Sequence, residues 1–203
     1  MIALIDYNMG NLRSVSNAFD KIGSHVEIVK DPNKLKDFDK IVLPGVGAYK
    51  DAMRSLKSNG MQEAIIEFAK SGKHLLGICL GMQLLLESSE EFGFTQGLGL
   101  VEGNVKKFNK LQFNYKLKVP HMGWNKLFVQ TNSKLFKDID REIYLYFIHS
   151  FHAICPEKFI VGKTFYGYDF ASAIEKENIY GFQPHPEKSH VNGLKILKNF
   201  VKL

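Results

Sequence analysis

HLLGICLGMQLL, residues 74–85, contains the change from strand to helix that decides the fold of this chain. Its first part, His74–Ile78, is an apolar run typical of a buried strand, and Met82–Leu86 is predicted to form a helix directly after it. The preceding sequence alternates in the same way, with strands expected at 2–5, 25–29 and 40–43 and helical faces at 12–22, 53–56 and 61–68. This alternation predicts βαβ units, and therefore a mostly parallel central sheet with helices on both faces.

The second half of the chain has a different character. Strand-like segments are expected at 101–108, 124–129, 143–148, 159–165 and 179–182, whereas only 191–201 has a clear helical face. No internal repeat and no Ser- or Gly-rich linker divides the sequence. We therefore expect an α/β fold with an antiparallel extension, in a single domain spanning residues 1–203.

The turn between the strand and the helix of the opening stretch carries Cys79. Gly77 and Gly81 lie two residues to either side of it, which is the spacing of a sharp turn that presents a nucleophile. Residues without a Cβ are needed where such a turn brings backbone segments close together. The positive end of the following helix favours a thiolate, so the pattern indicates a nucleophilic cysteine. The alternative for an isolated cysteine is a buried structural role.

A thiolate nucleophile needs a general base, and QPHPEKS at residues 183–189 offers one. Only a proline separates His185 from Glu187, so a stiff segment can direct both side chains the same way. Glu187 can then hold the imidazole of His185 in one tautomer, as the acid does in a Ser-His-Asp triad. A His-Pro-Glu tripeptide alone is usually a surface turn. Its place after the strand expected at 179–182, at the same sheet edge as Cys79, favours the triad.

Composition and charge exclude several classes of protein. The 203 residues are 45% hydrophobic and 24% charged, which is ordinary for a globular chain and excludes a disordered or fibrous one. The net charge is +6, but only three of the 27 basic residues are arginine. The basic residues form no run of five or more, so nucleic-acid binding is disfavoured. No stretch approaches the roughly 20 apolar residues of a membrane span, and the N-terminus lacks the basic start of a signal peptide. Two cysteines fit a reducing compartment, so we expect a cytoplasmic protein.

GICLGMQLL (77–85) and QPHPEKS (183–189) together resemble the class I glutamine amidotransferases, which have a Cys-His-Glu triad. Three further segments are similar to one branch of this family: IDYNMGNLRSV (5–15), PGVGAY (44–49) and VPHMGWN (119–125). That branch consists of glutaminase subunits that supply ammonia to a (β/α)8-barrel cyclase in histidine biosynthesis. The likeness spans essentially the whole chain. It implies hydrolysis of L-glutamine to L-glutamate and ammonia, in a heterodimer with such a cyclase.

The resemblance also implies a role for each matching residue. The catalytic triad would be Cys79, His185 and Glu187. The oxyanion hole would use the backbone amide of Leu80 and the strand formed by Gly45, Val46 and Gly47. The residues that match glutamine contacts are Gln83, Glu91, His149, Ser150 and Phe151. Those that match the partner interface are Pro120, His121, Met122, Gly123, Trp124, Asn125, Tyr146 and Lys188. Neither a metal nor a cofactor is implied.

Two positions depart from the family pattern, and three alternative functions stay open. Pro184 stands where a Phe is usual before the catalytic histidine, and Phe151 stands where a Tyr is more usual after Ser150. A paralogous subunit that supplies ammonia for amidination of a surface sugar would carry the same chemistry. A glutaminase of pyridoxal phosphate synthesis is disfavoured, because VPHMGWN is not expected there. A silent scaffold that only binds a cyclase is disfavoured by the intact triad.

Overall fold

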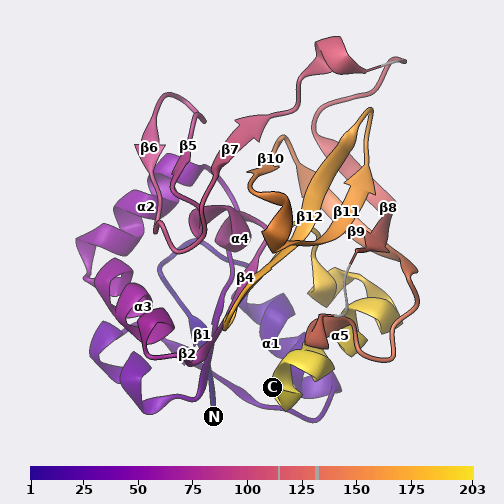
Figure 1. The fold of residues 1–203 in the computed structure, drawn as a ribbon. Helices are drawn as coiled ribbons and strands as arrows, with labels where there is room; N and C mark the ends of the chain where they lie inside the picture. The colour runs from indigo at the N-terminus through magenta and orange to yellow at the C-terminus, as the bar shows by residue number, and fades with distance from the viewer. Residues whose placement is uncertain (114, 131–132) are drawn as a thin grey trace.

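The computed structural model describes residues 1–113, 115–130 and 133–203. Five short strands form the parallel half of its sheet: β2 (Val26–Val29), β1 (Ile2–Ile5), β3 (Lys40–Leu43), β4 (His74–Ile78) and β13 (Ile179–Phe182). They are neighbours in that order, and every pair among them runs parallel (Figure 1). The strand from the end of the chain, β13, therefore lies in the middle of the sheet, directly beside β4.

Beyond β13 the sheet becomes mostly antiparallel. It continues through β12 (Asp169–Lys176), β10 (Phe151–Ile154), β7 (Asn104–Lys107), β5 (Ser88–Ser89) and β6 (Thr95–Gln96). A second branch leaves β12 through β11 (Ile160–Phe165), β8 (His121–Val129) and β9 (Glu142–His149). All thirteen strands of the described residues thus belong to one sheet, as the predicted antiparallel extension of an α/β core requires.

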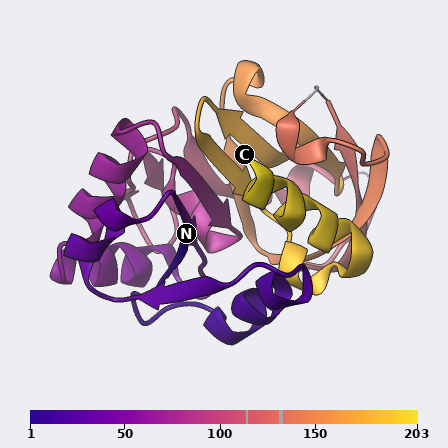
Figure 2. The same cartoon turned by 90° about the horizontal axis from the view of Figure 1, so that it is seen from below.

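Helices cover both faces of the parallel half. They are α1 (Leu12–Lys21), α2 (Tyr49–Ser58), α3 (Met61–Lys70), α4 (Leu80–Leu84) and α5 (His190–Lys202). Short 3-10 turns occupy Pro32–Asp37, Lys110–Gln112, Lys134–Phe136, Glu157–Phe159 and Pro186–Lys188. Figure 2 shows α1 and α5 packed together, apart from α2 and α3. No helix among the described residues is long and apolar enough to cross a membrane.

The apolar strands follow from this double cover. In β1, Ala3 and Ile5 pack into the core on the side of α2 and α3, whereas Ile2 and Leu4 pack into the core that contains α1 and α5. Because successive strand residues face opposite sides, a strand covered on both sides must be apolar throughout. The predicted parallel sheet with helices on both faces is confirmed.

Two boundaries differ from the sequence prediction for a physical reason. The helix predicted at Met82–Leu86 begins at Leu80, immediately after Cys79, and ends at Leu84. It ends early because the carbonyl oxygens of its last residues accept hydrogen bonds from the backbone of Leu98 and Leu100, which belong to the following loop. The carbonyls are satisfied by that loop rather than by further helical turns.

Strands β10 and β12 were not predicted from the sequence. The segment DFASAIEK of β12 contains small residues, and five of its eight side chains are buried in succession. It shows neither the polar–apolar alternation of a half-exposed strand nor a run of β-branched residues. Strand β10 has only four residues. Both strands are fixed by pairing with distant segments, which local sequence does not reveal.

Candidate active site

The expected turn is present at Cys79. This residue follows β4 and has φ 55° and ψ −111°, a conformation that side chains other than glycine rarely adopt. A Cβ on Gly77 would lie 2.7 Å from the backbone nitrogen of Met82, and one on Gly81 would lie 1.9 Å from the carbonyl oxygen of Leu43. The two glycines are therefore required for the backbone to close this turn.

Strand β13 brings the candidate base to the nucleophile. Phe182 is the parallel partner of Ile78, and the backbone nitrogen of Cys79 donates a 2.7 Å hydrogen bond to the carbonyl oxygen of Phe182. Three residues later, the backbone nitrogen of His185 donates to the carbonyl oxygen of Tyr146 at 2.8 Å. Pro184 is buried between these two anchors and leaves both intact. His185 is thus positioned by β4 on one side and β9 on the other.

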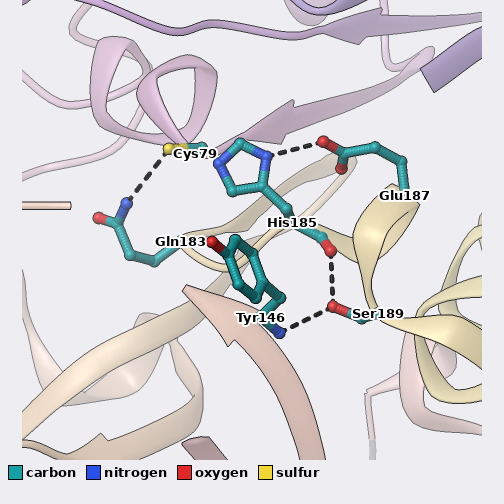
Figure 3. A network of polar contacts seen from close by, with 6 residues as sticks. All are labelled: Cys79, Tyr146, Gln183, His185, Glu187 and Ser189. Atoms are coloured by element: carbon teal, nitrogen blue, oxygen red, sulfur yellow. Dashed lines mark hydrogen bonds and ion pairs between the residues drawn. The ribbon is translucent and has the colours of Figure 1, made fainter. Parts of the chain in front are cut away.

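His185 and Glu187 form the pair expected from the sequence. The Nδ1 atom of His185 and the Oε1 atom of Glu187 are 2.7 Å apart, and only 3% and 1% of the two side chains are exposed. Figure 3 shows the ring of His185 between Cys79 and Glu187, with its second nitrogen on the side of Cys79. That nitrogen, Nε2, is buried and makes no hydrogen bond with the residues that the structure describes. It is therefore available for proton exchange with a substrate at Cys79.

Two opposing effects set the charge of His185. Burial lowers the pKa of its ring, whereas a Cys79 thiolate and the Glu187 carboxylate raise it, and together they bring the pKa to about 10. At neutral pH the ring is then an imidazolium, paired with the Glu187 carboxylate. The imidazolium holds a proton ready for a leaving group at Cys79.

We expect Cys79→Ala to lower the pKa of His185, because the change removes an anion while burial of the ring remains. NMR titration of the ring carbon-bound protons measures this shift. The variant Cys155→Ala is the matched control and leaves the titration unchanged, since Cys155 belongs to a separate core. An unchanged titration of His185 in Cys79→Ala would contradict the ion pair.

A pocket of about 350 Å³ opens over the nucleophile. Of the residues expected at the active site, it is lined by Val46, Gly47, Cys79, Leu80, Gln83, Glu91, His149, Ser150, Phe151 and His185. Pro120 and Lys188, two of the residues expected at a partner interface, line it as well. The structure therefore brings together side chains from both halves of the sequence, as the resemblance implied.

The segment expected to form part of the oxyanion hole, residues 45–47, follows β3 as an irregular loop and lies beside the nucleophile turn. A Cβ on Gly45 would come within 2.9 Å of the backbone nitrogen of Gly81, so only glycine allows the two segments to approach this closely. The hydroxyl group of Tyr7 donates a 2.8 Å hydrogen bond to the carbonyl oxygen of Pro44, which anchors the start of this loop. Gly47 has φ +100°, while the Val46 side chain between the glycines is 41% exposed.

Sequence reasoning missed Gln183. Its Oε1 atom accepts a 2.9 Å hydrogen bond from Gln83 Nε2, and its own Nε2 atom lies 3.8 Å from the sulfur of Cys79. Gln83 Nε2 also donates to the carbonyl oxygen of Phe151 at 2.9 Å. The position of Gln183, two residues before His185, was the available signal. Glu91 is held separately, because its Oε2 atom accepts a 2.7 Å hydrogen bond from the backbone nitrogen of Tyr49.

The residues expected at a partner interface lie mostly on β8, with Pro120 just before it, Tyr146 on β9 and Lys188 in the turn after His185, and those on β8 divide between its two faces. Met122 and Trp124 are exposed, and the Trp124 ring stacks on His190 with 5.0 Å between the ring centroids. Lys188 lies over the ring of Tyr146, with 5.9 Å from its Nζ atom to the ring centroid. Of these side chains, Lys188 lines the pocket, whereas Met122 and Trp124 lie on the exposed face of β8.

His121 differs from the expectation of an interface side chain. It is only 2% exposed, and its imidazole stacks on the rings of Phe147 and Tyr166 within the protein. The reason is strand alternation: His121 shares the inward face of β8 with Leu127, which is fully buried, whereas Met122 and Trp124 face outward.

Known proteins resemble this chain in sequence and in fold. The sequence model of the family described as glutamine amidotransferase class-I matches residues 3–203. The chain belongs to the class I glutamine amidotransferases. It is 61% identical to the imidazole glycerol phosphate synthase subunit HisH of Sulfurimonas denitrificans, over 100% of this chain and 98% of that protein. It is 52% identical to the protein of the same name from Wolinella succinogenes, over 100% of both.

Solved structures show the same fold at low sequence identity. The PurLQS structure from Thermotoga maritima matches with a TM-score of 0.76 at 21% identity, over 99% of this chain and 97% of that chain. A crystal structure described as a glutamine amidotransferase matches with a TM-score of 0.77 at 15% identity, over 100% of this chain and 98% of that chain. The class I amidotransferase architecture is therefore confirmed for this α/β chain.

Proposed function

We propose that this class I amidotransferase is the glutaminase subunit of an imidazole glycerol phosphate synthase. It hydrolyses L-glutamine to L-glutamate and passes the ammonia to a (β/α)8-barrel cyclase subunit in histidine biosynthesis. The observation that carries the proposal is Cys79 on its strained turn, beside the 2.7 Å His185–Glu187 pair in a pocket of about 350 Å³. Relatives named as subunits of that synthase support the pathway.

The first half-reaction forms a thioester. The Cys79 sulfur attacks the side-chain carboxamide carbon of glutamine, and the carbonyl oxygen becomes an oxyanion. We expect the amide of Leu80 and an amide of the Val46–Gly47 segment to stabilise this charge, and the lining of the pocket by all three residues supports this role. His185 Nε2 gives its proton to the amide nitrogen, the carbon–nitrogen bond breaks, and ammonia leaves.

The second half-reaction restores the cysteine. His185, now neutral, removes a proton from a water molecule, and the resulting hydroxide attacks the thioester carbon. The carbon–sulfur bond breaks, glutamate leaves, and the Cys79 thiolate with the His185 imidazolium is regenerated. Glu187 keeps Nδ1 of the ring protonated throughout, so that Nε2 is the atom that exchanges protons.

The partner surface is proposed around the mouth of the pocket. Pro120 and Lys188 line the pocket. The exposed Met122 and Trp124 lie on β8, which begins directly after Pro120. Aromatic and methionine side chains are typical anchors of protein interfaces. A partner seated here would cover the exit for ammonia. We also infer a cytoplasmic location, in keeping with two cysteines that are both unpaired.

We expect the isolated chain to be a poor glutaminase and the complex with ligand-bound cyclase to hydrolyse glutamine at least about tenfold faster. The reason lies in the Val46–Gly47 segment, whose amide can rotate between glycines and so present or withdraw an oxyanion donor. A partner that binds the donating state better shifts the balance towards it. Steady-state hydrolysis by the chain alone and by the complex measures the effect.

The variant Gly47→Pro tests where this activation arises. Proline has φ near −65° and cannot adopt the φ of +100° found here, so we expect it to abolish activation without dissociating the complex. Full activity of the isolated wild-type chain would contradict the coupling. Isolation of the complex from native lysate, followed by identification of the barrel subunit, tests the pathway itself. A sugar-amidating partner would overturn the histidine assignment and leave the glutaminase chemistry standing.

A further inference from the structure

A line of buried hydrogen bonds connects β8 to the pocket through two histidines. His121 and His149 are direct cross-strand partners in the β8–β9 pair, and the Nδ1 atom of His121 is 3.1 Å from the Nε2 atom of His149. On one side, Asn125 Nδ2 lies 3.2 Å from His121 Nε2. On the other side, His149 Nδ1 lies 2.8 Å from the carbonyl oxygen of Phe151.

The direction of every bond in this line is determined by its ends. A carbonyl oxygen can only accept, so His149 must carry its proton on Nδ1, and in a neutral ring Nε2 must then accept. His121 therefore donates from Nδ1 and accepts at Nε2. Asn125 supplies that last donor, because its Oδ1 atom already accepts from the backbone nitrogen of Lys126 at 2.8 Å.

Burial keeps both rings neutral. Desolvation lowers the pKa of His121 to about 4 and lowers that of His149 far below its usual value, with the neighbouring His121 adding to the effect. The rings of Tyr166 and Phe147 both stack on the ring of His121, with centroid distances of 4.0 Å and 4.7 Å. The pair is thus enclosed by aromatic rings and does not titrate near neutral pH.

The same carbonyl oxygen continues the line to the nucleophile. The oxygen of Phe151 also accepts from Gln83 Nε2 at 2.9 Å, and Gln83 Nε2 donates to Gln183 Oε1 at 2.9 Å. Because the oxygen end of the Gln183 amide is held by Gln83, its Nε2 end must face the Cys79 sulfur, 3.8 Å away. Asn125 and Cys79 are therefore the two ends of one oriented network.

We propose that His121 is a positioning residue: together with His149 it forms a neutral relay, both rings protonated on Nδ1, that fixes the Phe151 carbonyl and through it the Gln83 and Gln183 amides at Cys79. The inference rests on the proposed glutaminase function and adds His121 and Gln183 to the groups that govern its rate. His121 does not itself line the pocket, and its hydrogen bond to the lining residue His149 is the first step of the network that leads to Cys79.

The tautomers provide a test that does not depend on activity. Long-range 15N–1H NMR of the imidazole rings in the wild-type chain should show Nδ1 protonated and Nε2 unprotonated in both His121 and His149. Free histidine in water favours the opposite tautomer, so this is a specific outcome. A proton on Nε2 of either ring, or a charged ring at pH 7, would overturn the relay. Assignment uses the spectra of His121→Phe and His149→Gln, each of which lacks the signals of one ring.

Kinetics test the consequence for catalysis. His121→Phe keeps an aromatic ring for stacking but removes the donor to His149, so the acylation rate per active site should fall about tenfold, as loss of one buried hydrogen bond predicts. His121→Gln restores one donor and one acceptor and should recover most of that loss. Tyr166→Phe is the matched control: it keeps the stack on His121 and removes only the hydroxyl bond to the Lys118 carbonyl, so the rate should not change.

Active sites are counted by titration with a glutamine-analogue alkylating agent, so that partial unfolding does not imitate a slower rate. Equal acylation rates per site in His121→Phe and wild type would overturn the proposal. A His121→Gln variant whose rate is no higher than that of His121→Phe would overturn it as well. If His121→Phe does not fold, the wild-type tautomers decide the question. A wild-type complex without glutaminase activity but with both Nδ1 tautomers would refute the proposed function and leave the relay intact.

Discussion

Cys79→Ala is expected to abolish glutamine hydrolysis while the fold and the complex with the partner persist. Alanine keeps the Cβ that the turn already accommodates, so the backbone at φ 55° is not further strained. It lacks the sulfur that forms the thioester, and loss of a covalent nucleophile costs several powers of ten in rate. Single-turnover hydrolysis and size-exclusion chromatography of the complex measure the two halves of this expectation.

The second cysteine of the chain provides the control for this experiment. Burial and the nearby Glu157 raise the pKa of Cys155 to about 11, so this thiol is not nucleophilic at neutral pH. We expect Cys155→Ala to keep the wild-type rate. A Cys79→Ala protein with more than about a hundredth of the wild-type turnover would rule out Cys79 as the nucleophile.

His185→Asn is expected to lower the rate of hydrolysis on the order of 10⁵-fold. The loss caused by Glu187→Gln is expected to be smaller by about one to two powers of ten. Asparagine cannot exchange a proton at the position of Nε2, so both half-reactions lose their acid and base. Glutamine leaves that imidazole in place and removes only the charge that pairs with Nδ1 at 2.7 Å. Single-turnover rates of the two variants, measured separately for acylation and deacylation, provide the comparison.

The reverse order of these two effects would mean that Glu187 acts directly on the substrate. The structure argues against such contact, because the Glu187 side chain is only 1% exposed and does not line the pocket. Ser189 contacts the backbone of His185 rather than its ring: the hydroxyl group of Ser189 donates a 2.6 Å hydrogen bond to the carbonyl oxygen of His185. It supports the position of the base without taking part in proton transfer.

Local sequence was enough to predict the parts of the site whose geometry is local. The glycines on either side of Cys79 indicate the turn because their spacing is itself the steric requirement. His185 and Glu187 are two positions apart, so their pairing follows from the proline between them. The alternating apolar segments of the first half likewise gave the parallel sheet, since periodicity reports which faces are covered.

The contacts that sequence reasoning missed join distant positions. Gln183 reaches Cys79 across 104 positions, and His121 reaches His149 across 28. Placing the start of β8 at residue 124 rather than 121 hid the alternation that turns His121 inward with Leu127. Such contacts depend on which strands pair and in which register, and that is decided by the completed sheet.

The place of β13 has a consequence for how the chain becomes active as it is made. This strand, residues 179–182, lies between β4 and β12, so the centre of the sheet is completed by the strand that is synthesised after all the other described strands. Until then the nucleophile turn has neither the hydrogen bond from Cys79 to Phe182 nor a base beside it. A nascent chain that stops before β13 therefore lacks both the completed turn and its base. The order of strands ties the onset of catalysis to the synthesis of β13 and the segment after it.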